Sequence, residues 1–184
     1  MLRRRLLLLL AAAAPAGCAS PNPTLYVLAP QSGTPEPGAP RTVELREIGL
    51  ARYLERSQIV RSSEGYRLDV LSNEWWGEPL GAMLSRVLVQ ELTQRLLGSM
   101  VFAESGAITA NAGATVAVNI QRLDADATGA VVLIAQVEVS LRAVATRNVH
   151  LTVPPPGPGT PGLVAAMSQA LAQLADTIAG MLRG

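Results

Sequence analysis

Few residues in this 184-residue sequence could carry acid–base, nucleophilic or metal chemistry. It contains one cysteine, Cys18, and one histidine, His150, and no aspartate, glutamate or cysteine lies close to that histidine. A zinc site needs several such ligands. The sequence also lacks a glycine-rich phosphate loop and the turn that presents a serine nucleophile. We therefore expect no catalytic residue, no metal site and no cofactor.

Asp124 and Asp126 are spaced as a carboxylate pair that could share acid–base work. They belong to the stretch DADATG, which separates two strand-like segments. Aspartate is favoured in turns because its side chain bonds to nearby backbone N–H groups. We therefore predict that both are turn residues and that the protein is not an enzyme.

Cys18 follows a segment typical of a secretory signal. Three arginines at positions 3–5 precede a continuous apolar stretch, residues 6–14, and the small residues 16–17 precede the cysteine. Pro15 interrupts the apolar run. A membrane-spanning helix needs about 20 apolar residues, and this run is shorter. The alternative is a buried, small apolar cysteine, but the segment after it is polar and proline-rich.

The Ala16-Gly17-Cys18 ending resembles a bacterial lipobox, in which the cysteine begins the mature chain and carries the lipid. The resemblance implies that Cys18 is lipidated and holds the protein to a membrane through its acyl chains, at about 0.8 kcal/mol per buried CH₂. Ala19 stands where an inner-membrane retention signal usually has aspartate, which implies an outer-membrane lipoprotein facing the periplasm.

The mature chain is mildly acidic. The leader removes three of the 15 basic residues and none of the 14 acidic ones, so 12 positive and 14 negative groups remain and the net charge is about −2. A nucleic-acid-binding protein needs clustered positive charge. We therefore expect no nucleic-acid partner.

Alternating apolar and polar residues, bounded by turn-forming residues, predict several strands. The longest are residues 115–123 and 131–145, and in the second the apolar positions run from Val131 to Leu141 at every other residue. The shorter predicted strands are residues 24–29, 43–48, 58–62 and 65–72.

Apolar residues repeat at intervals of three and four over residues 79–96 and again over residues 163–181, which predicts two helices with one buried face each. Proline- and glycine-rich stretches, residues 31–40 and 154–162, are predicted loops. The fold class that we predict is α+β, a single domain with a mainly antiparallel sheet covered on one side by the two amphipathic helices.

These patterns divide the chain into three parts. Residues 1–17 are the predicted lipoprotein signal peptide. Residues 18–40 contain the lipidated N-terminus, the first strand and a Pro/Gly-rich linker. Residues 41–184 form the main domain, to which the strand at 24–29 also belongs.

Residues 52–80 read RYLERSQIVRSSEGYRLDVLSNEWWGEPL and hold four of the six aromatic residues of the chain. This stretch resembles the ABC-transport auxiliary lipoproteins of the PqiC (YmbA) type, in which a Tyr-Leu-Asp-Arg segment and Gln-Ile-Val are followed by Trp-Ala-Glu-Pro-Leu. The candidate partner-binding or motif residues are Arg52, Tyr53, Leu54, Arg56, Gln58, Trp75, Trp76, Glu78 and Pro79.

The resemblance implies a periplasm-facing lipoprotein subunit of an MCE/ABC-type system that moves lipids or other apolar solutes between membranes. Its implied partners are an MCE-domain protein and the inner-membrane permease and ATPase of the same system. A homo-oligomer is also implied, and the predicted strands at 58–62 and 65–72 are short enough to be edge strands available for pairing.

Two alternatives stay open beside this interpretation. A stand-alone envelope lipoprotein could bind an apolar ligand as a carrier or chaperone, but it would need a large apolar cavity, whereas two helices on a sheet predict a filled core. An envelope hydrolase would need a nucleophile and a base, which the sequence lacks.

Trp75 and Trp76 are adjacent, so in an extended segment their side chains point to opposite faces. We predict that Trp76, two residues before Glu78, packs in the core and that Trp75 is the more exposed of the two. Exposed tryptophan often contributes strongly to interfaces. The alternative is that the whole stretch is a structural corner at the start of the helix.

Overall fold

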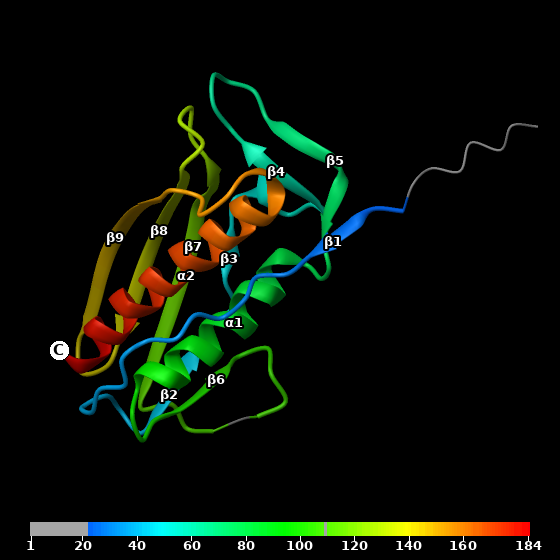
Figure 1. Cartoon of the computed structure of the whole chain (residues 1–184). Helices are drawn as coiled ribbons and strands as arrows, with labels where there is room; N and C mark the ends of the chain where they lie inside the picture. Colours follow the sequence, from blue (N-terminus) through cyan, green and yellow to red (C-terminus); the bar gives the residue numbers. More distant parts are fainter. Residues whose placement is uncertain (1–21, 109) are drawn as a thin grey trace, which may run out of the picture.

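A computed structural model describes residues 22–184 except residue 109. In it, a nine-stranded sheet is covered on one face by two helices (Figure 1), which confirms the predicted single α+β domain. No helix in this described part is long and apolar enough to cross a membrane. The elements are β1 (Thr24–Tyr26), β2 (Thr42–Leu45), β3 (Gly49–Leu50), the short 3₁₀ helix η1 (Arg52–Leu54), β4 (Gln58–Ser62), β5 (Asp69–Trp76), α1 (Leu80–Arg95), β6 (Met100–Ala103), β7 (Ala114–Ala125), β8 (Val131–Ser140), β9 (Val144–Val153) and α2 (Gly159–Arg183).

Strand β7 is the centre of the sheet. On one side it pairs antiparallel with β8, and β8 pairs antiparallel with β9, so three long strands form a continuous meander. On the other side β2, β3 and β4 follow one another along β7, all parallel to it. The longest pairings are therefore antiparallel, as predicted, and the short parallel ones are additional.

Beyond β7 the sheet divides into two branches. One branch continues from β2 to β6, and the other continues from β4 through β5 to β1. β4 lies between β7 and β5, although it pairs with β7 only at Ser62, so residues 58–62 do not form the predicted edge strand. β1 pairs with β5 only at Glu74–Trp76, so residues 69–72, the part of the predicted strand 65–72 that lies in β5, have a strand partner on one side only among the described residues. The long outer strand at the opposite side is β9.

Both predicted helices are present, and each buries its predicted apolar stripe. The reason is the periodicity itself, since residues three and four apart share one face of a helix. In α1 the stripe residues Met83, Leu84, Val87, Leu88 and Leu92 are all fully buried. They pack with the inward side chains of β7 and β8 in one hydrophobic core.

The single strand predicted at 131–145 is in fact the strand β8, a turn and the first residues of β9. β8 ends at Ser140, the chain turns over residues 141–143, and β9 begins at Val144, which pairs with Ser140. Leu141, which we expected on the inward face, lies in the turn and is 43% exposed. The turn contains neither glycine nor proline, and apolar and polar residues go on alternating through it. The sequence therefore gives no sign that the strand ends there.

The strand predicted at 65–72 also begins later, as β5 at Asp69. Gly65 and Tyr66 both have positive φ, 61° and 65°, and form a turn. Glycine tolerates this conformation, whereas a tyrosine there is uncommon. Tyr66 therefore lies at the tip of the β4–β5 hairpin with its side chain in solvent.

Residues 28–36, between β1 and β2, lie along the seam between α1 and α2 (Figure 1), and we call this segment the strap. The Ala29 N–H donates to Ser168 Oγ of α2 at 3.1 Å, and the Gln31 N–H donates to Glu91 Oε1 of α1 at 2.8 Å. The predicted linker at 31–40 therefore begins as an extended segment bound to both helices.

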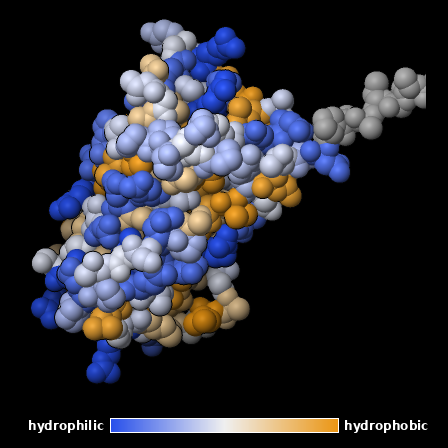
Figure 2. All heavy atoms as spheres, viewed as in Figure 1, coloured by the Kyte–Doolittle hydropathy of each residue, from blue (hydrophilic) through white to orange (hydrophobic). Residues whose placement is uncertain are grey.

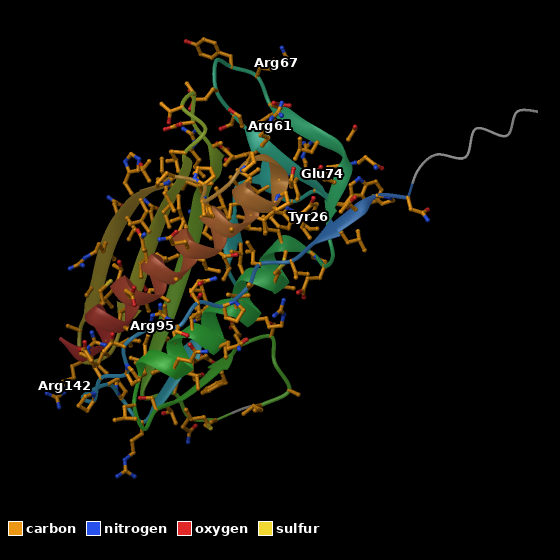
Figure 3. The ribbon with its side chains drawn as sticks, viewed as in Figure 1. Tyr26, Arg61, Arg67, Glu74, Arg95 and Arg142 are labelled. Atoms are coloured by element: carbon orange, nitrogen blue, oxygen red, sulfur yellow. The ribbon has the colours of Figure 1, made fainter. Side chains whose placement is uncertain are left out.

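Arg95 joins the strap to both helices from within the molecule (Figure 3). Its side chain is only 2% exposed. The guanidinium donates from Nε to Asp176 Oδ1 at 2.6 Å, from Nη1 to the carbonyls of Gln31 and Glu91 at 3.3 and 3.2 Å, and from Nη2 to the Ala172 carbonyl at 3.3 Å.

Glu91 lies beside this arginine and is fully buried, and its Oε2 has no hydrogen-bond partner among the described residues. Burial raises its pKa to about 7, although the Gln31 N–H and Arg95 oppose the shift and Asp176 adds to it. A buried carboxylate with one free oxygen is expected to hold a proton at mildly acid pH.

Replacing Glu91 with glutamine should make stability less dependent on pH. The pKa of Glu91 is raised from 4.5 to about 7 by folding, so the stabilisation present below about pH 4.5 is lost as the pH rises through about 7. Relative to Glu91→Gln, we expect the wild-type free energy of unfolding to fall by about 3 kcal/mol between about pH 4.5 and about pH 8. Urea unfolding at both pH values measures the difference.

The matched control is Glu138→Gln, since Glu138 lies on the exposed face of β8. That variant should show the same pH profile as the wild type. A Glu91→Gln profile parallel to the wild-type profile would contradict the assignment of the buried proton to Glu91.

Candidate functional site

The two halves of the sequence motif meet at one cleft. β4 and β5 pair antiparallel, and the Trp76 N–H donates to the Ser57 carbonyl at 2.7 Å, which brings the segment after η1 beside the start of α1. The cleft at this junction has a volume of about 730 Å³. Its lining residues are Glu47, Ile48, Leu50, Glu55, Arg56, Ser57, Trp76, Gly77, Glu78, Pro79, Leu80, Gly81, Ala82, Ser85 and Ser105.

The chemistry of the cleft is apolar with a charged border. Ile48, Leu50, Trp76, Pro79 and Leu80 supply the apolar surface. The charged lining residues are three carboxylates and one guanidinium, those of Glu47, Glu55, Glu78 and Arg56. Such a cleft suits an apolar segment that carries basic groups beside it.

Two of these charged groups already have partners. The Glu78 carboxylate accepts from Arg86 Nε of α1 at 3.1 Å, and Arg56 Nε donates to the Tyr53 carbonyl at 2.9 Å. Among the described residues, no group of three or more histidine, cysteine, aspartate or glutamate side chains is placed to hold a metal ion.

The cleft unites only part of the predicted set. Arg56, Trp76, Glu78 and Pro79 line it. The remaining described candidates lie outside the lining: Arg52 is exposed in η1, Leu54 is buried, Gln58 and Trp75 are half-buried at paired positions of β4 and β5, and Tyr53 points elsewhere. Cys18, the predicted lipidation site, lies outside the described residues.

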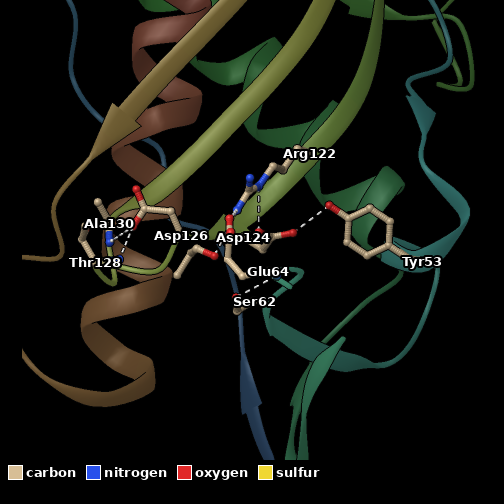
Figure 4. Close-up of polar contacts among 9 residues, drawn as sticks. Tyr53, Ser62, Glu64, Arg122, Asp124, Asp126, Thr128 and Ala130 are labelled. Carbon is tan, nitrogen blue, oxygen red and sulfur yellow. Dashed lines mark hydrogen bonds and ion pairs between the residues drawn. The ribbon is translucent and has the colours of Figure 1, made fainter. Parts of the chain in front are cut away.

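Tyr53 belongs to a polar network on the other side of η1 (Figure 4). Its hydroxyl donates to Asp124 Oδ2 at 2.7 Å, and Arg122 Nε donates to Asp124 Oδ1 at 2.9 Å. Arg122 Nη2 also donates to Glu64 Oε1 of the β4–β5 hairpin at 2.6 Å. The network therefore joins η1 and the hairpin to the central strand.

The expectation that Asp124 is a turn residue is wrong, because it lies in β7 and is fully buried. Asp126 is a turn residue as predicted, and its Oδ1 accepts from the N–H groups of Thr128 and Ala130 at 2.8 and 3.1 Å. A sequence signal for the network exists. Arg122 and Asp124 stand at positions where the alternation of β7 would place apolar residues. They follow the shift in the pairing register between β7 and β8 that lies between Ile120 and Arg122.

Burial and the neighbouring carboxylates raise the pKa values of Tyr53 and Arg122, so both side chains keep their protons. Burial, followed by the hydrogen bond to Asp124, raises the pKa of Tyr53 well above its ordinary value, so the hydroxyl remains a donor. Burial alone would lower the pKa of Arg122, but Glu64 and Asp124 outweigh it and raise that pKa. The buried Asp124 carboxylate thus faces two donors.

The two tryptophans lie as predicted. Trp76 is 7% exposed and packs in the hydrophobic core, whereas Trp75 is half-buried and donates its indole N–H to the Ser72 carbonyl at 3.1 Å. They alternate in β5, next to β1, where Leu25 pairs with Trp75 and Tyr26 with Trp76. Trp76 both supports the start of α1 and forms part of the cleft.

Comparisons with known proteins agree with this architecture. A family model described as "ABC-type transport auxiliary lipoprotein component" matches residues 26–179. None of the curated proteins matches the chain significantly.

Two solved structures are similar to the whole fold. One is a crystal structure of an uncharacterized protein, with a TM-score of 0.74 and 21% identity over 87% of this chain and 98% of that one. The other is protein XCC0632 from Xanthomonas campestris, of family DUF330, with a TM-score of 0.69 and 20% identity over 86% of this chain and 93% of that one. At these identities the likeness shows the fold alone.

Alanine substitutions of the two tryptophans should have unequal effects on stability. Trp76→Ala removes a buried side chain and should cost about 3–5 kcal/mol. Trp75→Ala, at a half-buried position, should cost about 1 kcal/mol. Urea unfolding of both variants measures the difference, and a larger loss for Trp75→Ala would show that the assignment is reversed.

Proposed function

The chain belongs to the family of ABC-type transport auxiliary lipoprotein components, and we propose that it is the lipoprotein subunit of an MCE-type system that moves lipids or other apolar solutes between the two membranes. The family places it with an ABC transport system in the cell envelope. In this proposal the protein acts by binding and assembly, without catalysis. The observation that carries it is the junction of both motif segments at one cleft.

The proposed role of the cleft is to bind a segment of the MCE-domain protein. A volume of about 730 Å³ suits a few side chains of one segment. The apolar surface of Trp76 and Leu50 would receive apolar side chains, while Glu47 and Glu55 would attract basic groups beside them. The permease and ATPase would then be held through the MCE-domain protein.

The alternative is a stand-alone carrier that encloses an apolar ligand. Such a carrier needs an enclosed apolar cavity, whereas the described cleft has four charged residues in its lining. The helices otherwise cover a filled core. We therefore favour partner binding over ligand storage.

The proposed location is the outer membrane, with the domain in the periplasm. Cys18 would carry the lipid, and Ala19 would leave the protein free to move on from the inner membrane. β1 begins at Thr24, six residues after Cys18, so the start of the sheet would lie within about 22 Å of the anchor.

Replacing Cys18 with serine should abolish lipid attachment. Wild-type protein should fractionate with outer membranes and carry the added mass of its acyl chains, because the thiol is the acceptor. Cys18→Ser should be recovered uncleaved or unanchored. Wild-type protein of unmodified mass in the soluble periplasmic fraction would contradict the assignment, and mass spectrometry of both fractions measures it.

Blocking the cleft should weaken the interaction with the MCE-domain protein. Ala82 is an exposed cleft residue of α1, so Ala82→Trp fills the cleft without removing a core side chain. We expect co-purification from membranes in mild detergent to fall about tenfold or more, corresponding to a loss of over about 1.4 kcal/mol.

The matched control is Gln90→Trp, on an exposed position of the same helix away from the cleft. It should co-purify as the wild type does. Undiminished recovery with Ala82→Trp would exclude the cleft as the binding surface, and absence of the MCE-domain protein from the wild-type sample would exclude the proposed function.

A further inference from the structure

An exposed apolar surface lies where β1 meets the end of β5. Leu25 and Val27 are 62% and 56% exposed, and Leu25 pairs with the half-buried Trp75. Val27 also lies against Gly77, where an added Cβ would be 3.2 Å from Val27 Cγ1. We call Leu25, Val27 and Trp75 the apolar corner. Figure 2 shows hydrophobic surface in this region, close to the start of the described chain.

The alternation along β1 keeps this surface outside the core. Tyr26 packs against the core and Leu28 is buried, so Leu25 and Val27 point away from it. In the neighbouring strand, Glu74 and Trp76 flank Trp75 on the opposite face, and Glu74 Oε2 is buried. Tyr26 and Glu74 can be located in Figure 3. No carboxylate therefore shares the face of the corner within β1 and the last three residues of β5.

The length of chain before β1 fixes the distance of the corner from the lipid. Leu25 lies seven residues after Cys18. An extended chain spans at most about 3.6 Å per residue, so the backbone of Leu25 lies within about 25 Å of the acylated residue. Residues 18–35 include no charged side chain, so no ionic group must be desolvated as this segment approaches a bilayer.

The side chains of the corner suit the interface of a bilayer. Tryptophan is enriched at the headgroup level because its ring is amphipathic. The indole N–H of Trp75 already donates to the Ser72 carbonyl, so partial removal from water leaves no unsatisfied donor. Leu25 and Val27 would add apolar area beside it.

We propose that the apolar corner rests on the surface of the bilayer that anchors the protein, with Leu25, Val27 and Trp75 at the headgroup level. This inference depends on the lipidation of Cys18 in the proposed function. Contact at the corner would orient the domain on the membrane. Gly77 lies against Val27 and also lines the cleft, so the corner and the cleft are neighbours. The mouth of the cleft would then be held beside the membrane surface.

Tryptophan fluorescence tests this contact directly, because the chain has only two tryptophans. Full-length lipidated protein is reconstituted into phosphatidylethanolamine–phosphatidylglycerol vesicles, with or without brominated acyl chains that quench nearby indoles. Wild-type emission should fall in brominated vesicles. Trp75→Phe leaves Trp76 as the only indole, and because Trp76 is 7% exposed and faces the core, bromination should lower its emission much less than that of the wild type.

The combined Leu25→Asp and Val27→Asp variant makes the test specific to the corner. It retains Cys18 and should float with the vesicles, but the loss of Trp75 emission should be smaller than in the wild type. Both residues are exposed, so folding should be preserved, and circular dichroism checks this.

The outcomes separate this inference from the proposed function. The vesicles contain no partner protein, so the absence of an MCE-domain partner would not alter the result. Lipidated, floating protein whose emission falls equally in the wild type and Trp75→Phe, or falls in neither, would overturn the inference alone. Protein of unmodified mass that does not float would overturn it together with the lipid anchor of the proposed function.

Discussion

The fold depends on one buried cation, the guanidinium of Arg95. Burial of an unpaired charge is costly, so its donors must be satisfied where α1, α2 and the strap meet. The Asp176 side chain is 60% exposed, so its attraction is partly screened by solvent, and the three backbone carbonyls contribute the remaining contacts. This geometry fixes the two helices relative to the strap and directs the chain toward β1 at one end and β2 at the other.

The family motif has two physical roles on opposite sides of η1. Tyr53 reaches Asp124 in the central strand, and Leu54 and Trp76 are buried, so these residues hold the junction in place. Arg56 and Glu78 line the cleft, where each also has a partner within the domain, the Tyr53 carbonyl and Arg86. The structural interpretation of the motif therefore applies to Tyr53, Leu54 and Trp76, and the proposed interface is confined to the residues that line the cleft.

The sequence predicted the elements whose burial is periodic. The stripe of α1 and the alternation of β8 were recognisable because one face of each lies in the core. The turn at Leu141 was not, because it lacks glycine and proline, and β3 and β6 are too short to show a period. The sequence predicted only some of the residues that line the cleft. Its motif residues were identified. Glu47, Ile48 and Leu50 were not, because their positions depend on the pairing of β3 with β7, which is distant in sequence.

The parallel pairing of β1 with β5 has a mechanical consequence. Tension along β1 from the proposed N-terminal anchor would load the hydrogen bonds to β5 together, in shear, instead of opening them one after another. Behind β1, the strap distributes the remaining force over both helices through Ser168 and Glu91. With the proposed lipid on Cys18, the domain would therefore resist being pulled open from its tethered end, the end at which thermal motion of the membrane would act on it.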